Sequence, residues 1–147
     1  RRLYAARSYC VFRKVLYVLG ICLLAFAVSP VLPKADAAIK EVNDVYCWNG
    51  DLNYPLLTFG MQTFEVLDRS SAYVVRNTEQ EALIQVNSIL IVRMDDQPGS
   101  VSTREISYDK VNGTIKWNGN VQRNESFESR RYVIPACRLV FADQGIC

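Results

Sequence analysis

Residues 106–117, ISYDKVNGTIKW, contain the strongest fold signal in this chain. Asn112-Gly113 is a dipeptide preferred in two-residue type I′ turns, and strand-forming residues flank it on both sides. A turn of this type places Asp109 opposite Lys116, as a cross-strand pair of opposite charge. The apolar side chains then share the other face: Ile106, Tyr108, Ile115 and Trp117. The segment therefore predicts an antiparallel hairpin with one buried face.

Further strands are expected on both sides of this hairpin. They are rich in aromatic and β-branched residues and are separated by turn residues: Val42–Trp48, Leu56–Leu67, Ala72–Arg76 and Ser102–Val111. Arg131–Phe141 is expected to be the last strand, with Pro135 placing it at a sheet edge or a bulge. This pattern predicts an all-β fold, a single antiparallel β-sandwich or small barrel.

Residues 78–94 fit two structures. Thr78 followed by Glu81 has the spacing of a helix capping box, and apolar residues recur at helical intervals after it. Alternation along the same segment and the branched run Ile89–Val92 favour a strand. We expect a strand from about Leu83 to Met94. The alternative is an α+β fold with a helix near residues 79–92.

The N-terminal 37 residues have the pattern of an export signal. Basic residues precede the uncharged apolar run Val15–Val28, and the small residues Ala35 and Ala37 fit a signal peptidase site. The run is shorter than the roughly 20 apolar residues that a membrane-spanning helix needs. Residues 1–37 are therefore expected to be a signal peptide, with an uncleaved membrane anchor as the alternative. Residues 38–147 are expected to form one periplasmic or secreted domain.

Removing the leader changes the charge of the protein. The whole chain has a formal charge of +2, but residues 38–147 have 11 Lys and Arg against 14 Asp and Glu, a net charge of −3. Nucleic-acid binding requires clustered cations. A nucleic-acid partner is therefore not expected, and a membrane contact is expected only through an uncleaved N-terminal segment.

The expected export also bears on the cysteines, because disulfides persist in oxidising compartments. The mature part contains Cys47, Cys137 and Cys147, of which two are expected to pair. Cys47–Cys137 is the preferred pair, and Cys137–Cys147 is the alternative. No metal site or cofactor is expected, since the chain has no histidine and no pair of closely spaced cysteines.

The absence of histidine also excludes Ser-His-Asp and Cys-His catalysis. A hydrolase based on two carboxylates is the remaining catalytic alternative, although no pair stands out in the sequence. The protein is therefore not expected to be an enzyme.

Two similar turns are the best candidates for a binding site. Trp48-Asn49-Gly50-Asp51 and Trp117-Asn118-Gly119-Asn120 each place a tryptophan before a tight turn. Aromatic rings can stack on a ligand while amides and carboxylates hydrogen-bond to it. The expected function is an exported, non-enzymatic binding module for a protein, glycan or envelope partner; the alternative is a membrane-anchored structural component of an envelope assembly. The candidate ligand-binding residues are Trp48, Asn49, Asp51, Trp117 and Asn118.

Overall fold

The computed structural model describes residues 39–147. The predicted signal peptide, residues 1–37, lies outside the described residues. The elements are β1 (Ile39–Val42), β2 (Val45–Trp48), β3 (Leu56–Phe59), β4 (Thr63–Asn77), β5 (Glu81–Val92), β6 (Gln97–Asp109), β7 (Thr114–Trp117), β8 (Asn120–Val121), the π-helix η1 (Ser129–Val133) and the α-helix α2 (Ile134–Asp143).

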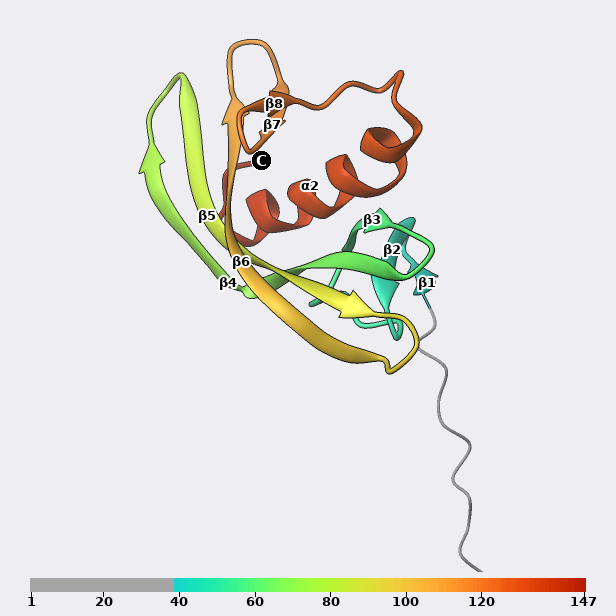
Figure 1. The fold of residues 1–147 in the computed structure, drawn as a ribbon. Helices are drawn as coiled ribbons and strands as arrows, with labels where there is room; N and C mark the ends of the chain where they lie inside the picture. Colours follow the sequence, from blue (N-terminus) through green and yellow to red (C-terminus); the bar gives the residue numbers. More distant parts are fainter. Residues whose placement is uncertain (1–38) are drawn as a thin grey trace, which may run out of the picture. The chain divides into compact units, whose positions relative to one another are not determined.

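The predicted antiparallel, mostly β architecture is confirmed. The first two strands form a small sheet, and the other six form a second sheet in which the order β3-β4-β5-β6-β7-β8 follows the chain. The larger sheet curls as a half-barrel and holds α2 against its inner face (Figure 1).

The hairpin of β6 and β7 is confirmed, but the predicted two-residue type I′ turn is wrong, since Gly113 has a positive φ and Asn112 does not, and the register differs by two residues. Asp109 pairs with Thr114 instead of Lys116. The Asp109 carboxylate accepts hydrogen bonds from the backbone N–H groups of Val111 and Asn112 at 2.9 and 3.0 Å, which favours a longer turn. A shift of two residues keeps every side chain on its face. The predicted apolar face is therefore present in the new register.

Three turns have a positive φ at both central residues, and each directly follows a short strand. They are Asn43-Asp44, Asn49-Gly50 and Asn118-Gly119. This geometry is that of type I′ hairpins, and Asn, Asp and Gly adopt it at low cost. The first of these turns divides the single strand predicted over Val42–Trp48 into β1 and β2, so that prediction is wrong.

The strand predicted over Leu56–Leu67 is also divided, by a turn at residues 60–62 between β3 and β4. Gly60 fits this turn closely, since its N–H donates to the Thr63 carbonyl and an added Cβ would lie 2.9 Å from the same oxygen. The separation predicted between the strands Leu56–Leu67 and Ala72–Arg76 is wrong, because β4 continues through residues 68–71 with a shift in register between Asp68 and Tyr73.

The strand interpretation of residues 83–94 is confirmed as β5, and the alternative helix near 79–92 is wrong. Thr78 and Glu81 do bond to each other, as their spacing suggested. The Thr78 N–H donates to the Glu81 carbonyl at 2.8 Å, and the Glu81 N–H donates to the Thr78 hydroxyl at 3.0 Å. In this protein the pair closes the turn between β4 and β5.

The predicted last strand, Arg131–Phe141, is wrong, because the segment forms η1 and α2. Its buried residues recur at helical intervals: Val133, Ile134, Ala136, Cys137, Val140 and Phe141. Pro135 is the second residue of α2, which follows η1 without a break, and the π-helical turn directly before it accommodates the missing N–H.

The core consists of two clusters on opposite faces of the larger sheet. The first cluster lies between α2 and the inner face and contains Leu67, Ile84, Ile106 and Phe141. The second lies under the small sheet and contains Leu56, Phe64, Val66 and Ile91. Successive residues of a strand point to opposite faces. The neighbours Val66 and Leu67 therefore enter different clusters, and β4 is buried on both sides there.

Candidate functional site

Trp48 ends β2 and is half-buried against the second cluster. Its indole N–H donates to the Asp96 carboxylate at 3.0 Å, in the turn after β5. Its ring makes edge contacts with Tyr54 and Phe64, at centroid distances of 5.7 and 6.5 Å. The polar group and much of the ring of Trp48 are therefore already engaged within the protein.

Asn49 and Asp51 lie in the exposed turn that follows Trp48. Asn49 has a φ of 54°. The Asp51 carboxylate accepts the N–H of Asn53 at 2.9 Å, and the Asp51 N–H donates to the Trp48 carbonyl at 2.9 Å. These bonds shape the turn and leave the Asn49 side chain exposed.

Trp117 and Asn118 lie at the end of β7. Trp117 is partly buried against the first cluster. Asn118 extends the contact between β7 and β6 by one residue. Its side-chain amide oxygen accepts the Glu105 N–H at 3.1 Å, and its own backbone N–H donates to the Glu105 carbonyl at 2.8 Å. The two predicted turns do not come together, since β2 and β7 lie at separate ends of the described fold (Figure 1).

The structure reveals a different group of exposed residues at two neighbouring turns. Arg93 joins the turn after β3 to the turn after β5. Its N–H donates to the Gln62 carbonyl at 2.9 Å, and its guanidinium donates to the carbonyls of Gly60 and Met61 at 3.1 and 3.0 Å. The guanidinium carbon also lies 4.6 Å from the centre of the Phe59 ring. We call Phe59, Met61, Arg93 and Met94 the hairpin-tip surface.

The hairpin-tip surface is mostly apolar and packs on buried aromatic residues. Phe59, Met61 and Met94 have exposed fractions of 46, 93 and 87%. Phe59 stacks on the buried Phe64 at 6.4 Å, and Phe64 contacts Trp48. The sequence contained one signal for this surface, since both methionines of the chain lie in turns. Their proximity depends on contacts between separate hairpins.

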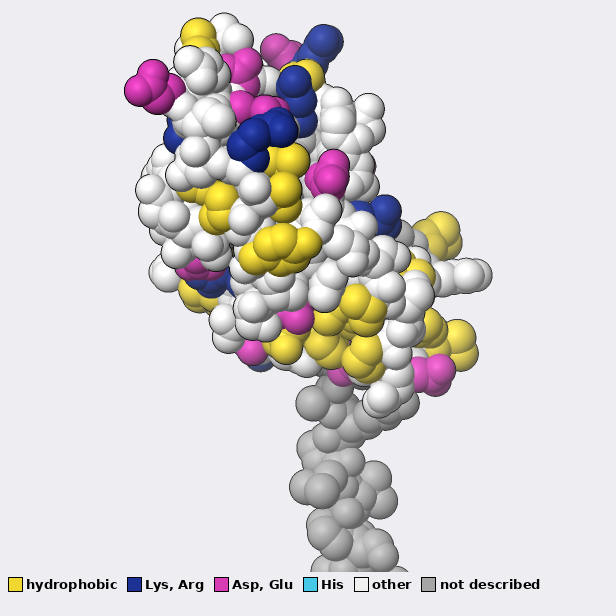
Figure 2. All heavy atoms as spheres, turned by 90° about the vertical axis from the view of Figure 1, so that its left-hand side faces the viewer, with side chains coloured by type: hydrophobic (Ala, Val, Ile, Leu, Met, Phe, Trp, Pro, Cys, Tyr) yellow, Lys and Arg dark blue, Asp and Glu magenta, His cyan; other side chains and the backbone are white. Residues whose placement is uncertain are grey.

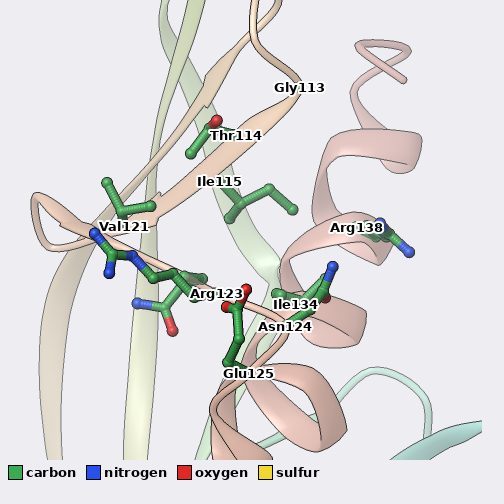
Figure 3. A pocket seen from close by; sticks show the side chains of 10 residues that line it. Gly113, Thr114, Ile115, Val121, Arg123, Asn124, Glu125, Ile134 and Arg138 are labelled. Carbon is green, nitrogen blue, oxygen red and sulfur yellow. The ribbon is translucent and has the colours of Figure 1, made fainter.

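A pocket of about 540 Å³ opens between α2 and the strands β7 and β8 (Figure 3). Ile115 and Ile134 form its apolar part, and the Glu125 carboxylate points into it. Arg123 and Arg138 lie on its two sides, with guanidinium groups that point away from each other. None of the predicted site residues lines this pocket.

A smaller hollow of about 300 Å³ contains two carboxylates, Glu81 and Asp109, which are cross-strand partners. The hydrogen bonds from the side chain and backbone of Asn112 hold the pKa of Asp109 below its ordinary value. Glu81 accepts a hydrogen bond from Arg76 at 2.6 Å. Carboxylate-based hydrolysis needs an acid with a raised pKa beside an ionised carboxylate, and the lowered pKa of Asp109 fits only the ionised role.

The disulfide predicted among Cys47, Cys137 and Cys147 is not found, because all three are free thiols. Cys47 is buried in β2, and its thiol lies 3.4 Å from the Lys40 carbonyl that it donates to. Cys137 is buried in α2 within the first cluster, where burial raises the pKa of its thiol to about 12. Cys147 is exposed in the segment that follows α2. The three thiols therefore occupy three different environments.

The charged side chains do not form a large patch of one sign on the face shown in Figure 2. Lys and Arg are mixed with Asp and Glu near its top, while hydrophobic side chains gather in its middle and lower parts. Within residues 39–147, no cluster of three or more His, Cys, Asp or Glu side chains could hold a metal ion. The helices of the same segment lack the length and apolar character needed to cross a membrane.

Comparisons of the chain with family models, with curated proteins and with solved structures found no match.

Proposed function

We propose that this protein is an exported, non-enzymatic binding module whose hairpin-tip surface contacts a protein partner outside the cytoplasm. The supporting observation is the exposure of Phe59, Met61 and Met94 on turns that Arg93 joins. Clustered exposed apolar residues are typical of interaction sites, and methionine adapts its shape to a partner.

A protein partner fits this surface better than a glycan. Stacking on a sugar requires an accessible aromatic face with polar groups beside it. Trp48, the predicted stacking residue, has Tyr54 and Phe64 against its ring and donates its N–H to Asp96. In this proposal Trp48 has an indirect role: it packs against Phe64, on which Phe59 of the hairpin-tip surface stacks.

The proposal of export depends on the pattern of residues 1–37. Cleavage after Ala37 would release a periplasmic or secreted domain. Retention of the segment would instead favour the membrane-anchored envelope component. The mass of the exported protein distinguishes these two forms.

Photo-crosslinking tests the binding surface in the source cell. A photoreactive residue placed at Met61 should yield a discrete crosslinked protein, while the same residue at Val111 should not. Val111 is a matched control, because it is 74% exposed in a turn at the other end of the sheet.

The captured protein is then identified by mass spectrometry and its affinity is measured. The double variant Met61→Ser and Met94→Ser should weaken binding by at least about tenfold, since it removes the apolar contacts. Val111→Ser should leave the affinity unchanged. Equal crosslinking at both positions, or equal affinity of both variants, would disprove the assignment of the surface.

A further inference from the structure

The strand β6 is much longer than its neighbour β7. β6 spans Gln97–Asp109, but β7 pairs only with Ile106–Asp109. Asn118 extends the contact by one residue, because it bonds to both the N–H and the carbonyl of Glu105. The preceding part of β6 therefore has β5 on one side and an open edge on the other.

The directions of the backbone groups follow from these contacts. The N–H and carbonyl of Glu105 point toward β7, whereas the Lys110 N–H donates in the other direction, to Gln80 at 2.9 Å. Backbone groups alternate in direction along a strand. Those of Thr103 and Val101 therefore point to the open side, where no group within residues 39–147 bonds to them.

We propose that this open edge of β6, at Val101–Thr103, binds an extended peptide segment of a partner protein by strand addition. The two residues offer two N–H donors and two carbonyl acceptors, the groups that strand addition uses. The proposed site is separate from the hairpin-tip surface and does not depend on its function.

The length of the edge favours a short peptide over a second copy of this chain. At one end, the backbone N–H and carbonyl of Glu105 are already hydrogen-bonded to Asn118. At the other end the register of β6 against β5 shifts between Val101 and Pro98. A symmetric antiparallel pairing of two β6 strands that joins Val101 to Thr103 would place Pro98 of the second copy opposite Ile106. Trp117 already holds that position.

The other long open edge, in the second half of β4, is less suited to strand addition. Its register against β5 shifts twice, between Asp68 and Tyr73 and between Val74 and Arg76. Such bulges protect edge strands from pairing. β6 has no shift between Val101 and Asp109.

The side chains beside the open edge indicate the chemistry of the peptide. Val101, Thr103 and Glu105 lie on one face because they alternate along β6. Val101 is 60% exposed and would pack against a β-branched residue. The exposed Glu105 carboxylate, whose one side-chain contact is to the Gln85 amide at 3.4 Å, favours a basic residue beside it. The expected ligand is an extended segment with β-branched and basic residues.

A phage-displayed library of random heptapeptides is the probe for this site. The full-length protein is the target, and Thr103→Pro is compared with Thr103→Ala. Proline removes the outward N–H and is tolerated on an open edge, whereas alanine keeps the N–H and removes only the hydroxyl. Circular dichroism of each variant checks that the sheet is intact.

Selected peptides should bind the wild type and Thr103→Ala equally and bind Thr103→Pro at least about tenfold more weakly. Bound peptide should also slow hydrogen exchange at the amides of Val101 and Thr103. The double variant Met61→Ser and Met94→Ser should retain peptide binding, which separates this site from the hairpin-tip surface.

Peptides N-methylated at the residues that face the edge provide a second measurement, which does not require a variant to fold. They should lose binding to the wild type. No enrichment, equal binding of methylated and unmethylated peptides, or exchange protection elsewhere in place of β6 would overturn the proposal.

Discussion

The three cysteines of residues 39–147 show how burial sets the chemistry of single side chains. Cys137 has no exposed surface, and burial raises the pKa of its thiol to about 12. Burial, and then the charge of Asp51, raises the pKa of Cys47. The thiolate is the reactive form of cysteine. The two buried thiols are therefore protonated at neutral pH, while Cys147 is exposed.

Native protein treated with iodoacetamide at about pH 8 should be alkylated at Cys147 but not at Cys47 or Cys137, since a raised pKa removes the thiolate. In guanidinium chloride all three should react, because unfolding restores ordinary pKa values. Peptide mapping by mass spectrometry measures each site. A disulfide-linked peptide that contains Cys47 or Cys137 would restore the pairing that the sequence predicted.

The surroundings of the candidate site residues could be predicted only in part from the sequence. Trp48, Asn49 and Asn118 were correctly placed at tight turns. The bonds of Trp48 to Asp96 and of Asn118 to Glu105 involve partners that are distant in the chain. Local turn chemistry cannot reveal such partners, and the same reason concealed the hairpin-tip surface.

Among the elements, hairpins were predicted best where the turn residues and the apolar faces agreed. The register of β6 and β7 still differed, because the Asp109 carboxylate organises the turn. The C-terminal segment was misinterpreted for a different reason. Its branched residues favour strands, but Ile134, Cys137 and Phe141 recur with the period of a helix. Pro135 does not oppose that period, because the helix accommodates it directly after the π-helix η1.

The turn between β7 and β8 tests the contribution of one side chain to an element. Asn118 combines a φ of 46° with the hydrogen bond from Glu105. Asn118→Gly removes that bond, but glycine adopts a positive φ without strain. The free energy of unfolding should therefore fall by about 1 kcal/mol. Asn118→Ala adds backbone strain, so the loss should be about 2 kcal/mol.

Urea denaturation of the two variants measures this difference. A larger loss for Asn118→Gly than for Asn118→Ala would show that backbone strain is not the determining factor at this turn.

At the scale of the whole molecule, the two core clusters share the strand β4. Val66 belongs to one cluster and Leu67 to the other. Arg69, two residues further along β4, also binds Asp143 at the end of α2, with distances of 2.8 and 2.5 Å. Loss of packing in one cluster therefore disturbs the strand on which the other depends, and the clusters should unfold together.

The two tryptophans can report on the clusters separately. Trp48 packs against the second cluster and Trp117 against the first. In each of the variants Trp48→Phe and Trp117→Phe, the urea midpoint from the remaining tryptophan's fluorescence should equal that from circular dichroism. Two distinct midpoints within either variant would show that the clusters unfold independently.

The order of strands in the larger sheet, which follows the chain from β3 to β8, also has a kinetic consequence. Each strand finds its partner next to it in sequence, so each pairing closes a short loop. Proteins with such local contacts have a low contact order and fold faster than β-sandwiches with long-range pairings. The sheet should therefore form by successive addition of hairpins, and the docking of α2 across it should be the step that joins distant parts of the chain.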